Sequence, residues 1–138
     1  MPSLTPEEAR VLGVVVRTGS IKAAVEELTL SRGKVDTAMA NIRQKYGTAH
    51  NAAALVSAYH SGFRVALELK GSLGGKKNLR VLRLVAIGMR NEEIMRAESL
   101  SRSGVERLIA QSCSSIGAGS GPSGVLTAIY YGLATGVL

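Results

Sequence analysis

A chain of 138 residues and 14.4 kDa has room for one ordinary domain or two very small ones. Its 17 Lys and Arg residues against 10 Asp and Glu residues give a net charge of +7, which excludes an acidic tail and favours a negatively charged partner such as nucleic acid. Hydrophobic residues make up 46% of the chain, as in globular proteins, and the single cysteine, Cys113, excludes an intramolecular disulfide and a cysteine-based zinc site within one chain.

The N-terminal sequence MPSLTPEEAR contains no basic segment followed by an apolar one. It therefore lacks the pattern of a secretory leader, and the expected location is the cytoplasm, away from a membrane. The chain has four Tyr, one Phe and no Trp, which argues against a protein that stacks single-stranded bases on aromatic side chains.

Helical signals follow one another through residues 1–62. Thr5 suits an N-cap, Pro6 suits the first position of a helix, and the two glutamates that follow favour the positive end of the helix dipole. Two apolar stripes with helical spacing come next, at Ile21, Ala24, Val25 and Leu28, and at Val35, Met39, Ile42 and Tyr46. Ser31 precedes the second stripe as a candidate N-cap, and Gly47 follows it as a candidate C-cap.

Alternation with a period of two is weak and confined to Phe63–Leu69, where a helix fits equally well. The sequence therefore predicts an all-α protein. Residues 63–78 contain Gly71, Gly74 and Gly75 followed by Lys76 and Lys77, a composition typical of a basic linker. Basic and acidic residues number seven and five in 1–62, four and one in 63–78, and six and four in 79–138, so the positive charge is spread over the whole chain.

The two sides of this linker match each other at a constant offset of 70 residues. The matching positions are Leu12 with Leu82, Leu30-Ser31-Arg32 with Leu100-Ser101-Arg102, Val35 with Val105, Gly47 with Gly117, and Gly62 with Gly132. Two copies are too few for a solenoid. The repeat instead predicts a duplicated small helical module, in effect a dimer on one chain.

Residues 4–62 resemble the LuxR/GerE-type helix-turn-helix domain. The resemblance is carried by Leu4-Thr5-Pro6, Glu8, Val11-Leu12, Ser20, Lys22, Leu28, Leu30-Ser31, Val35, Asn41-Ile42, Lys45 and Gly47. The second copy resembles the same domain from Leu79 onward, through Val81-Leu82-Arg83-Leu84, Gly88, Asn91-Glu92-Glu93-Ile94, Leu100-Ser101, Val105 and Gly117. The resemblance implies tandem four-helix modules, 1–62 and 79–138, in a bacterial or phage regulator. Region 4 of sigma factors shares the same three-helix core and is the related alternative.

In this family the third helix of each module lies in the major groove of DNA. The resemblance therefore implies DNA contacts at the start of both third helices, from Arg32, Gly33, Lys34 and Thr37 in the first copy and from Arg102, Ser103 and Arg107 in the second. Further phosphate contacts are expected from Lys22, Arg43 and Lys45, and from the linker residues Lys76 and Lys77. Without the resemblance, the same side chains read as ordinary solvated charges.

Two pairs of positions and one single position depart from the family pattern. Thr29 and Ser99 stand in the turn where the family usually has Gly, and Asp36 and Glu106 stand where it usually has a basic residue. In addition, Glu98 occupies the position of the apolar Leu28. These departures favour weaker DNA binding by one module, or its use as a protein-binding surface.

The chain carries no charge in its last 31 positions, Leu108 to Leu138. Its last 16 residues form an apolar helix candidate that is too short and too mixed to span a bilayer. In the family the fourth helix is a dimerisation surface, so the resemblance implies a protein interface at Val125, Ile129, Tyr130 and Leu133. The first copy, a second chain, another regulator and RNA polymerase are the alternative partners.

Signatures of an enzyme are poor. Residues 119–124 match the dinucleotide pattern G-x-G-x-x-G, but that pattern needs a preceding strand, whereas here a helix candidate precedes it. His50 and His60 have no carboxylate or cysteine at metal-ligand spacing, and Cys113 lies on a helix stripe that favours packing. We expect no catalysis, metal, cofactor or small-molecule substrate.

Two hypotheses follow. The first is a sequence-specific regulator that binds double-stranded DNA with both modules, at two half-sites about 10 bp apart or a multiple of that. The second is an antiactivator or co-regulator that binds another helix-turn-helix protein through its uncharged C-terminal helix. The positive charge favours the first hypothesis, and the acidic residues on the third helices favour the second.

Overall fold

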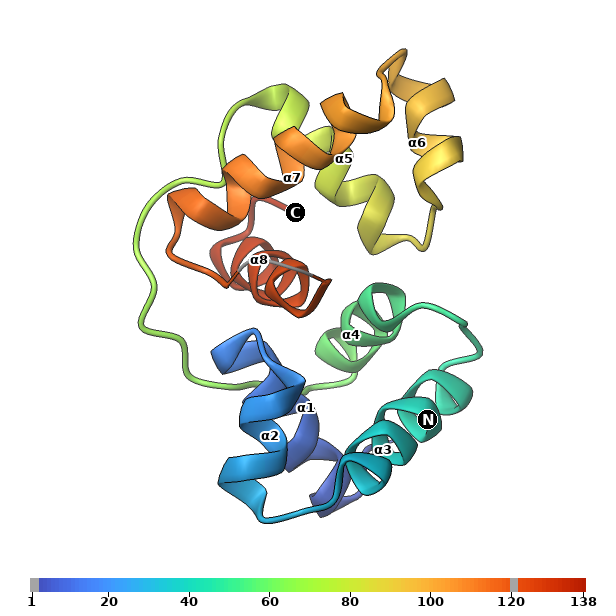
Figure 1. The fold of residues 1–138 in the computed structure, drawn as a ribbon, viewed down its shortest axis with the longest axis vertical. Coiled ribbons are helices and arrows are strands. Elements are labelled where there is room, and N and C mark those ends of the chain that lie inside the picture. The colour runs from blue at the N-terminus through green and yellow to red at the C-terminus, as the bar shows by residue number, and fades with distance from the viewer. Residues whose placement is uncertain (1–2, 120–121) are drawn as a thin grey trace.

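The computed structural model describes residues 3–119 and 122–138, and within them the chain forms eight α-helices and no strand (Figure 1). The helices are α1 (Pro6–Thr18), α2 (Ile21–Leu28), α3 (Arg32–Lys45), α4 (Asn51–His60), α5 (Lys76–Ala86), α6 (Asn91–Glu98), α7 (Arg102–Ser115) and α8 (Pro122–Thr135). The all-α fold class predicted from the sequence is therefore confirmed.

Helix α1 begins where Thr5 and Pro6 predict it. The Thr5 hydroxyl accepts a hydrogen bond from the backbone N–H of Glu8 (3.2 Å), and the Thr5 backbone N–H donates to the Glu8 carboxylate (2.9 Å). This capping box satisfies two backbone donors at the start of the helix. Helix α5 keeps half of the arrangement, because the backbone N–H of Gly75 donates to the Asn78 side-chain oxygen at 3.2 Å.

A residue in the left-handed conformation ends the second helix of each half. Thr29 follows α2 with a φ of 54°, and Ser99 follows α6 with a φ of 53°. Residues other than glycine rarely adopt this backbone conformation, which glycine adopts without strain. The two turns are therefore sharp at the positions where the family pattern has glycine, although neither residue is a glycine here.

Serine caps the third helix of both halves, as predicted for Ser31. The Ser31 hydroxyl accepts from the backbone N–H of Lys34 at 3.1 Å, and the Ser101 hydroxyl accepts from that of Gly104 at 3.1 Å. The bounds of α2 and α6, and those of α3 and α7, differ by the same 70 residues as the matching sequence positions.

The halves α1–α4 and α5–α8 are related approximately by half a turn in the plane of Figure 1. Helices α2 and α3 lie at one end of the molecule, α6 and α7 lie at the other, and α4 and α8 lie between them. Helix α8 packs on α1 and α4, while α4 packs on α5 and α8. The first helix of each half thus contacts the fourth helix of the other half, an arrangement that we call the crossed packing.

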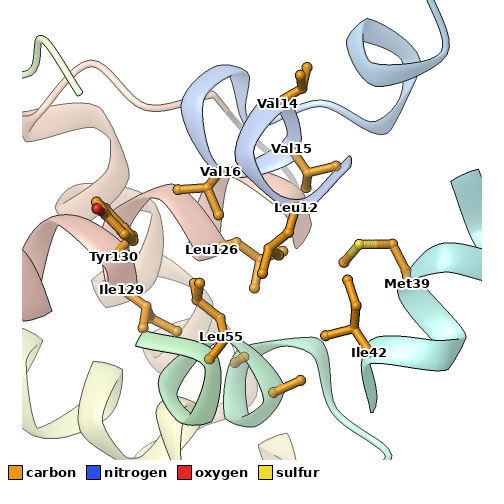
Figure 2. Packing of buried hydrophobic residues seen from close by; sticks show 14 of the residues in the cluster. Leu12, Val14, Val15, Val16, Met39, Ile42, Leu55, Leu126, Ile129 and Tyr130 are labelled. Atoms are coloured by element: carbon orange, nitrogen blue, oxygen red, sulfur yellow. The ribbon is translucent and has the colours of Figure 1, made fainter. Parts of the chain in front are cut away.

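The crossed packing encloses one main hydrophobic core. Figure 2 shows Leu12 of α1, Leu55 of α4 and Ile129 of α8 pointing into a common interior, and each of these side chains is at most 1% exposed. A second, smaller core consists of Val81, Ile94 and Val105, which hold α5, α6 and α7 together. The two halves therefore share most of their buried apolar surface, and sharing this surface stabilises their mutual arrangement.

Polar side chains of α8 support the same arrangement. The buried Thr127 hydroxyl donates to the carbonyl oxygen of Val16 at 2.6 Å, which gives a partner to one of the last carbonyls of α1. The Tyr130 hydroxyl accepts from the backbone N–H of Val65 at 2.8 Å and lies 2.9 Å from the carbonyl of the same residue. The Tyr131 hydroxyl donates to the carbonyl of Gly71 at 2.7 Å.

The segment between the halves is extended and lies on the core. Its side chains alternate, with Phe63, Val65, Leu67 and Leu69 half-buried and the residues between them exposed. Leu73 is only 3% exposed, and its carbonyl accepts from the Ser112 hydroxyl at 2.6 Å. Helix α5 begins at Lys76, so Lys76, Lys77 and Asn78 belong to a helix and not to the predicted linker.

The glycine-rich residues 119–124 connect α7 to the first turn of α8, and residues 120 and 121 of that pattern lie outside the described residues. A Cβ atom added at Gly124 would lie 1.7 Å from the carbonyl oxygen of Gly119. A side chain at position 124 is therefore excluded by the backbone. Close packing accounts for this glycine without a nucleotide.

Glu98 finds a charged partner at the position that Leu28 occupies in the first half. Its carboxylate accepts from the Arg80 guanidinium at 2.9 Å, and its side chain is 17% exposed. Leu28 packs on the main core as a half-buried side chain. In the second half, an ion pair between α5 and α6 thus stands at the position where the first half has the apolar packing of Leu28.

Candidate nucleic-acid interface

The exposed face of α3 begins at its first turn. Arg32, Gly33, Lys34 and Thr37 are exposed, while Val35, between them in the sequence, is fully buried. The predicted DNA-contacting residues of the first copy therefore share one outward face. Because Ser31 occupies the N-cap, the positive end of the helix dipole lies at the same place as these cations.

The exposed face of α7 contains the corresponding residues of the second copy. Arg102, Ser103 and Arg107 are exposed and Val105 is buried, in the register of α3. Gly104 stands where the first copy has Lys34 and is buried. The first turn of α7 therefore carries one cation fewer than that of α3.

Two of the predicted DNA-contacting arginines have acidic partners. The Arg32 guanidinium lies 3.1 Å from the Asp36 carboxylate one turn along α3, and the Arg102 guanidinium lies 2.9 Å from the Glu92 carboxylate of α6. Both pairs are exposed, so each contributes little to stability and can open when a phosphate competes for the guanidinium.

Lys34 and Arg107 have no ion-pair partner within residues 3–119 and 122–138, and the same holds for Lys22 on α2. Lys22 occupies the register position of Glu92, the residue that pairs with Arg102 in the second half. The exposed cations Lys22 and Lys34 therefore offer uncompensated positive charge on the surface that α2 and α3 form in the first half.

Lys76 and Lys77 are exposed at the first turn of α5. The next residue, Asn78, donates from its side-chain amide to the carbonyl of Leu108 at 3.0 Å, which holds the start of α5 against α7. Lysine at a helix N-terminus is unfavourable for the helix dipole, so these two cations do not serve the stability of α5. They lie beside α7, the helix that carries Arg107, although the sequence predicted them on a separate linker.

A shallow groove of about 880 Å³ separates the first turn of α1 from the exposed face of α3. Arg10, Lys34, Thr37 and Asn41 line it, with Glu7 at the α1 side. Neither Arg10 nor Asn41 is among the DNA contacts predicted from the sequence, although Asn41 belongs to the family pattern. Helical periodicity could have found Asn41, because Lys34, Thr37 and Asn41 follow the spacing i, i+3 and i+7 of one helix face.

Two predicted phosphate contacts are held by other parts of the chain. The Lys45 ammonium pairs with the Glu8 carboxylate and donates to the carbonyl of Ser3 at 3.0 Å. The Arg43 guanidinium donates to the side-chain oxygen of Asn51 at 2.6 Å. Both side chains thus tie α3 to its neighbours.

The environment of Glu8 affects its protonation. Burial by itself would raise the pKa of the Glu8 carboxyl, but hydrogen bonds from the Lys45 ammonium and from the Thr5 backbone N–H favour the ionised form. The pKa of Glu8 therefore lies below its ordinary value of 4.5. The ion pair of Glu8 and Lys45 joins α1 to α3. Local sequence patterns could not predict it, because the two residues are 37 positions apart in the sequence.

The side chains that the sequence predicted as a protein interface pack within the chain. Ile129 and Tyr130 are at most 3% exposed, and Val125 and Leu133 are half-buried. The Tyr130 ring makes an edge-to-face contact with Tyr59 of α4, with ring centroids 5.6 Å apart. This face of α8 therefore covers the first copy.

Cys113 is buried, and desolvation raises the pKa of its thiol. Residues 3–119 and 122–138 contain no group of three or more potential metal-ligating side chains. Among their helices, none has both the length and the apolar character needed to cross a bilayer.

Comparison with known proteins found no protein-family model, no curated protein and no solved structure that matches the chain.

Proposed function

We propose that this protein is a transcription regulator that binds double-stranded DNA in a sequence-specific manner. In this proposal each half supplies one helix-turn-helix unit, α2–α3 in the first and α6–α7 in the second. The second helix of each unit, α3 or α7, enters the major groove with its N-terminal turn first.

One observation carries the proposal. Two serine-capped helices, 70 residues apart, each have a buried valine, Val35 or Val105, and an outward face on which cations stand at the first turns. Side chains at the N-terminal end of a recognition helix reach base edges, and the helix dipole favours phosphate at the same end. The charge of +7 and the position of Lys76 and Lys77 beside α7 agree with a polyanionic partner.

The alternative function, an antiactivator that binds another regulator through α8, has less support. It needs an accessible apolar face on α8, whereas Ile129 and Tyr130 are buried against the first half. Using this face for a partner would require opening the main core.

The proposal is tested by measuring the affinity of the protein for two kinds of duplex DNA. One is a site that the protein selects from a random pool, and the other is DNA of random sequence. Replacing Arg107 by Ala should weaken binding to the selected site by about 1–3 kcal/mol and change binding to random DNA little, because arginine reads guanine through two hydrogen bonds. Replacing Lys76 and Lys77 should weaken both substrates alike, because phosphate contacts carry no sequence information.

Lys70→Ala is the matched control, since Lys70 is an exposed lysine in the extended segment. It removes the same charge as Lys77→Ala and should affect binding less. Affinity should fall with salt with a log–log slope of about 0.9 per neutralised phosphate. Absence of DNA binding at low salt would overturn the proposal.

A further inference from the structure

A cleft of about 880 Å³ lies between the two halves, where α4 packs on α5. Arg43 and Asn51 line it from the first half, and Met89, Ile109 and Val125 line it from the second. Clefts of this size, mostly apolar with a few polar groups, hold small organic molecules.

The cleft exists because the crossed packing is tight on one side only. On the α1–α8 side, a Cβ atom added at Gly19 would lie 3.4 Å from the Cα atom of Gly124, and Thr127 donates to Val16. On the α4–α5 side, contact is made by a side chain, since a Cβ atom at Gly88 would lie 3.0 Å from the His50 ring. The α1–α8 contact is therefore close enough to bring backbone atoms together, whereas the α4–α5 contact leaves space for the cleft.

One wall of the cleft carries a cation with unused hydrogen-bonding capacity. The half-buried Arg43 guanidinium donates to the neutral Asn51 amide, and no carboxylate in the described ranges forms an ion pair with it. A guanidinium offers five N–H donors in one plane, a geometry that suits a carboxylate or similar anion. The other wall carries Glu106 of α7, which would repel a second negative charge.

We propose that this cleft binds a small amphiphilic monoanion. Its anionic group pairs with Arg43, and its apolar body packs on Val85, Ile109 and Val125, which line the same cleft. Because Arg43 belongs to α3 and Ile109 to α7, the ligand would bridge the two helices that the proposed function places on DNA. Binding of the ligand to the cleft does not depend on the proposed function. Only the idea that the ligand changes DNA binding rests on it.

The test uses 8-anilino-1-naphthalenesulfonate, an aromatic monoanion whose fluorescence rises in apolar surroundings, in a titration of the full chain without DNA. We expect saturable binding of one dye per chain. Ala110 lines the cleft, and Ala110→Trp should fill it and weaken binding about tenfold or more. Ala40→Trp is the matched control, because Ala40 is the exposed residue at the same register of α3 and does not line the cleft.

A second comparison isolates the charge. Arg43→Met should weaken binding of the sulfonate about five- to tenfold and leave binding of the uncharged analogue N-phenyl-1-naphthylamine unchanged. Circular dichroism checks that each variant keeps the wild-type fold. If Ala110→Trp fails to fold, Ser114→Trp at the cleft, compared with Gln44→Trp at the matching position of α3, replaces it as the test of location.

Equal dye binding by wild type and Ala110→Trp, or equal loss of both dyes in Arg43→Met, would overturn the proposal. A separate titration with DNA then asks whether decanoate, a simple apolar monoanion, changes DNA affinity. Dye binding without any DNA binding would contradict the proposed function and leave the ligand site supported. DNA binding without dye binding would support the proposed function and contradict the ligand site.

Discussion

Thr29 and Ser99 hold the left-handed conformation at the turns that follow α2 and α6, and both side chains are exposed. The left-handed region costs an L-residue about 1–2 kcal/mol. Substitution by glycine removes this cost, but it also raises the entropy of the unfolded chain, which cancels part of the gain in stability. We therefore expect Thr29→Gly and Ser99→Gly each to raise the free energy of unfolding by about 0.5–1 kcal/mol, with the larger gain for the β-branched threonine.

Urea unfolding measures this effect. Ser61 is the control, because it is exposed at the end of α4 with an ordinary φ of −88°. Ser61→Gly should lower stability, since only the entropy of the unfolded chain changes there. A loss of stability in Thr29→Gly of the same size as in Ser61→Gly would count against strain at the turn.

The pair of Glu8 and Lys45 supports a prediction about pH. Lys45→Met leaves the buried Glu8 carboxylate with fewer partners and should lower the free energy of unfolding at pH 7 by on the order of 2–3 kcal/mol. The pKa of Glu8 is lowered in the folded state, so its contribution is present above its ordinary value of 4.5 and is lost as pH falls through the folded pKa.

The difference between wild type and Lys45→Met should therefore shrink when unfolding is measured at acid pH below the folded pKa of Glu8. Lys70→Met, which removes an exposed lysine, should have little effect at either pH. A difference that is independent of pH would assign the loss to packing of the lysine stem instead of its charge.

At the scale of the elements, Thr127 is a buried polar residue of α8 that joins this helix to α1 in the crossed packing. Thr127→Val keeps the shape of the side chain and leaves the carbonyl of Val16 without this donor in a buried site. We expect a loss of about 1–3 kcal/mol, measured by thermal or urea unfolding. Thr127→Ser should retain the hydrogen bond, and Ser57→Ala, at the matching position of α4, should cost less.

The elements that could be predicted from the sequence are those that local chemistry determines. The caps at Thr5 and Ser31 and the apolar stripe from Val35 to Ile42 act within a few residues, and the structure has the corresponding helix starts and buried face. The start of α5 was missed, because Gly75 and two lysines give no N-cap signal and Asn78 is held by α7, about 30 residues away.

The sequence left the partner of α8 open, with the first copy as one of the alternatives, because α4 and α8 are apolar helices that fit either half by periodicity alone. Their partners are selected by contacts between distant residues, such as Thr127 with Val16 and Tyr130 with Val65. In the candidate interface, the outward register of Arg32, Lys34 and Arg107 follows from helix periodicity, whereas the ion pair of Lys45 with Glu8 depends on tertiary contact.

For the whole molecule, the shared core fixes α3 and α7 relative to each other. If both helices bind DNA, the two half-sites should have one preferred separation, near 10 bp or a multiple of it. Shifting one half-site by about 5 bp should place it on the opposite side of the duplex and reduce affinity to that of a single half-site. Footprinting and titration of both sites measure this, and equal affinity for all separations would contradict a rigid arrangement.

The crossed packing also predicts how the chain behaves when it is cut between Lys70 and Gly71, in the segment that joins the halves. Residues 1–70 alone would expose the apolar face of α1 that α8 covers, and residues 71–138 alone would leave α5 without α4. An isolated half of this size buries too little apolar surface to be stable once that cover is removed.

We therefore expect neither fragment to show a cooperative thermal transition by itself. Mixed in equal amounts, they should regain helix content and a single transition, and they should elute together at the size of the intact 14.4 kDa chain. Circular dichroism and size-exclusion chromatography with light scattering measure both properties. A cooperatively folded monomer of either fragment would show that the halves are independent modules, as the repeat in the sequence by itself suggests, and that the crossed packing is not required for folding.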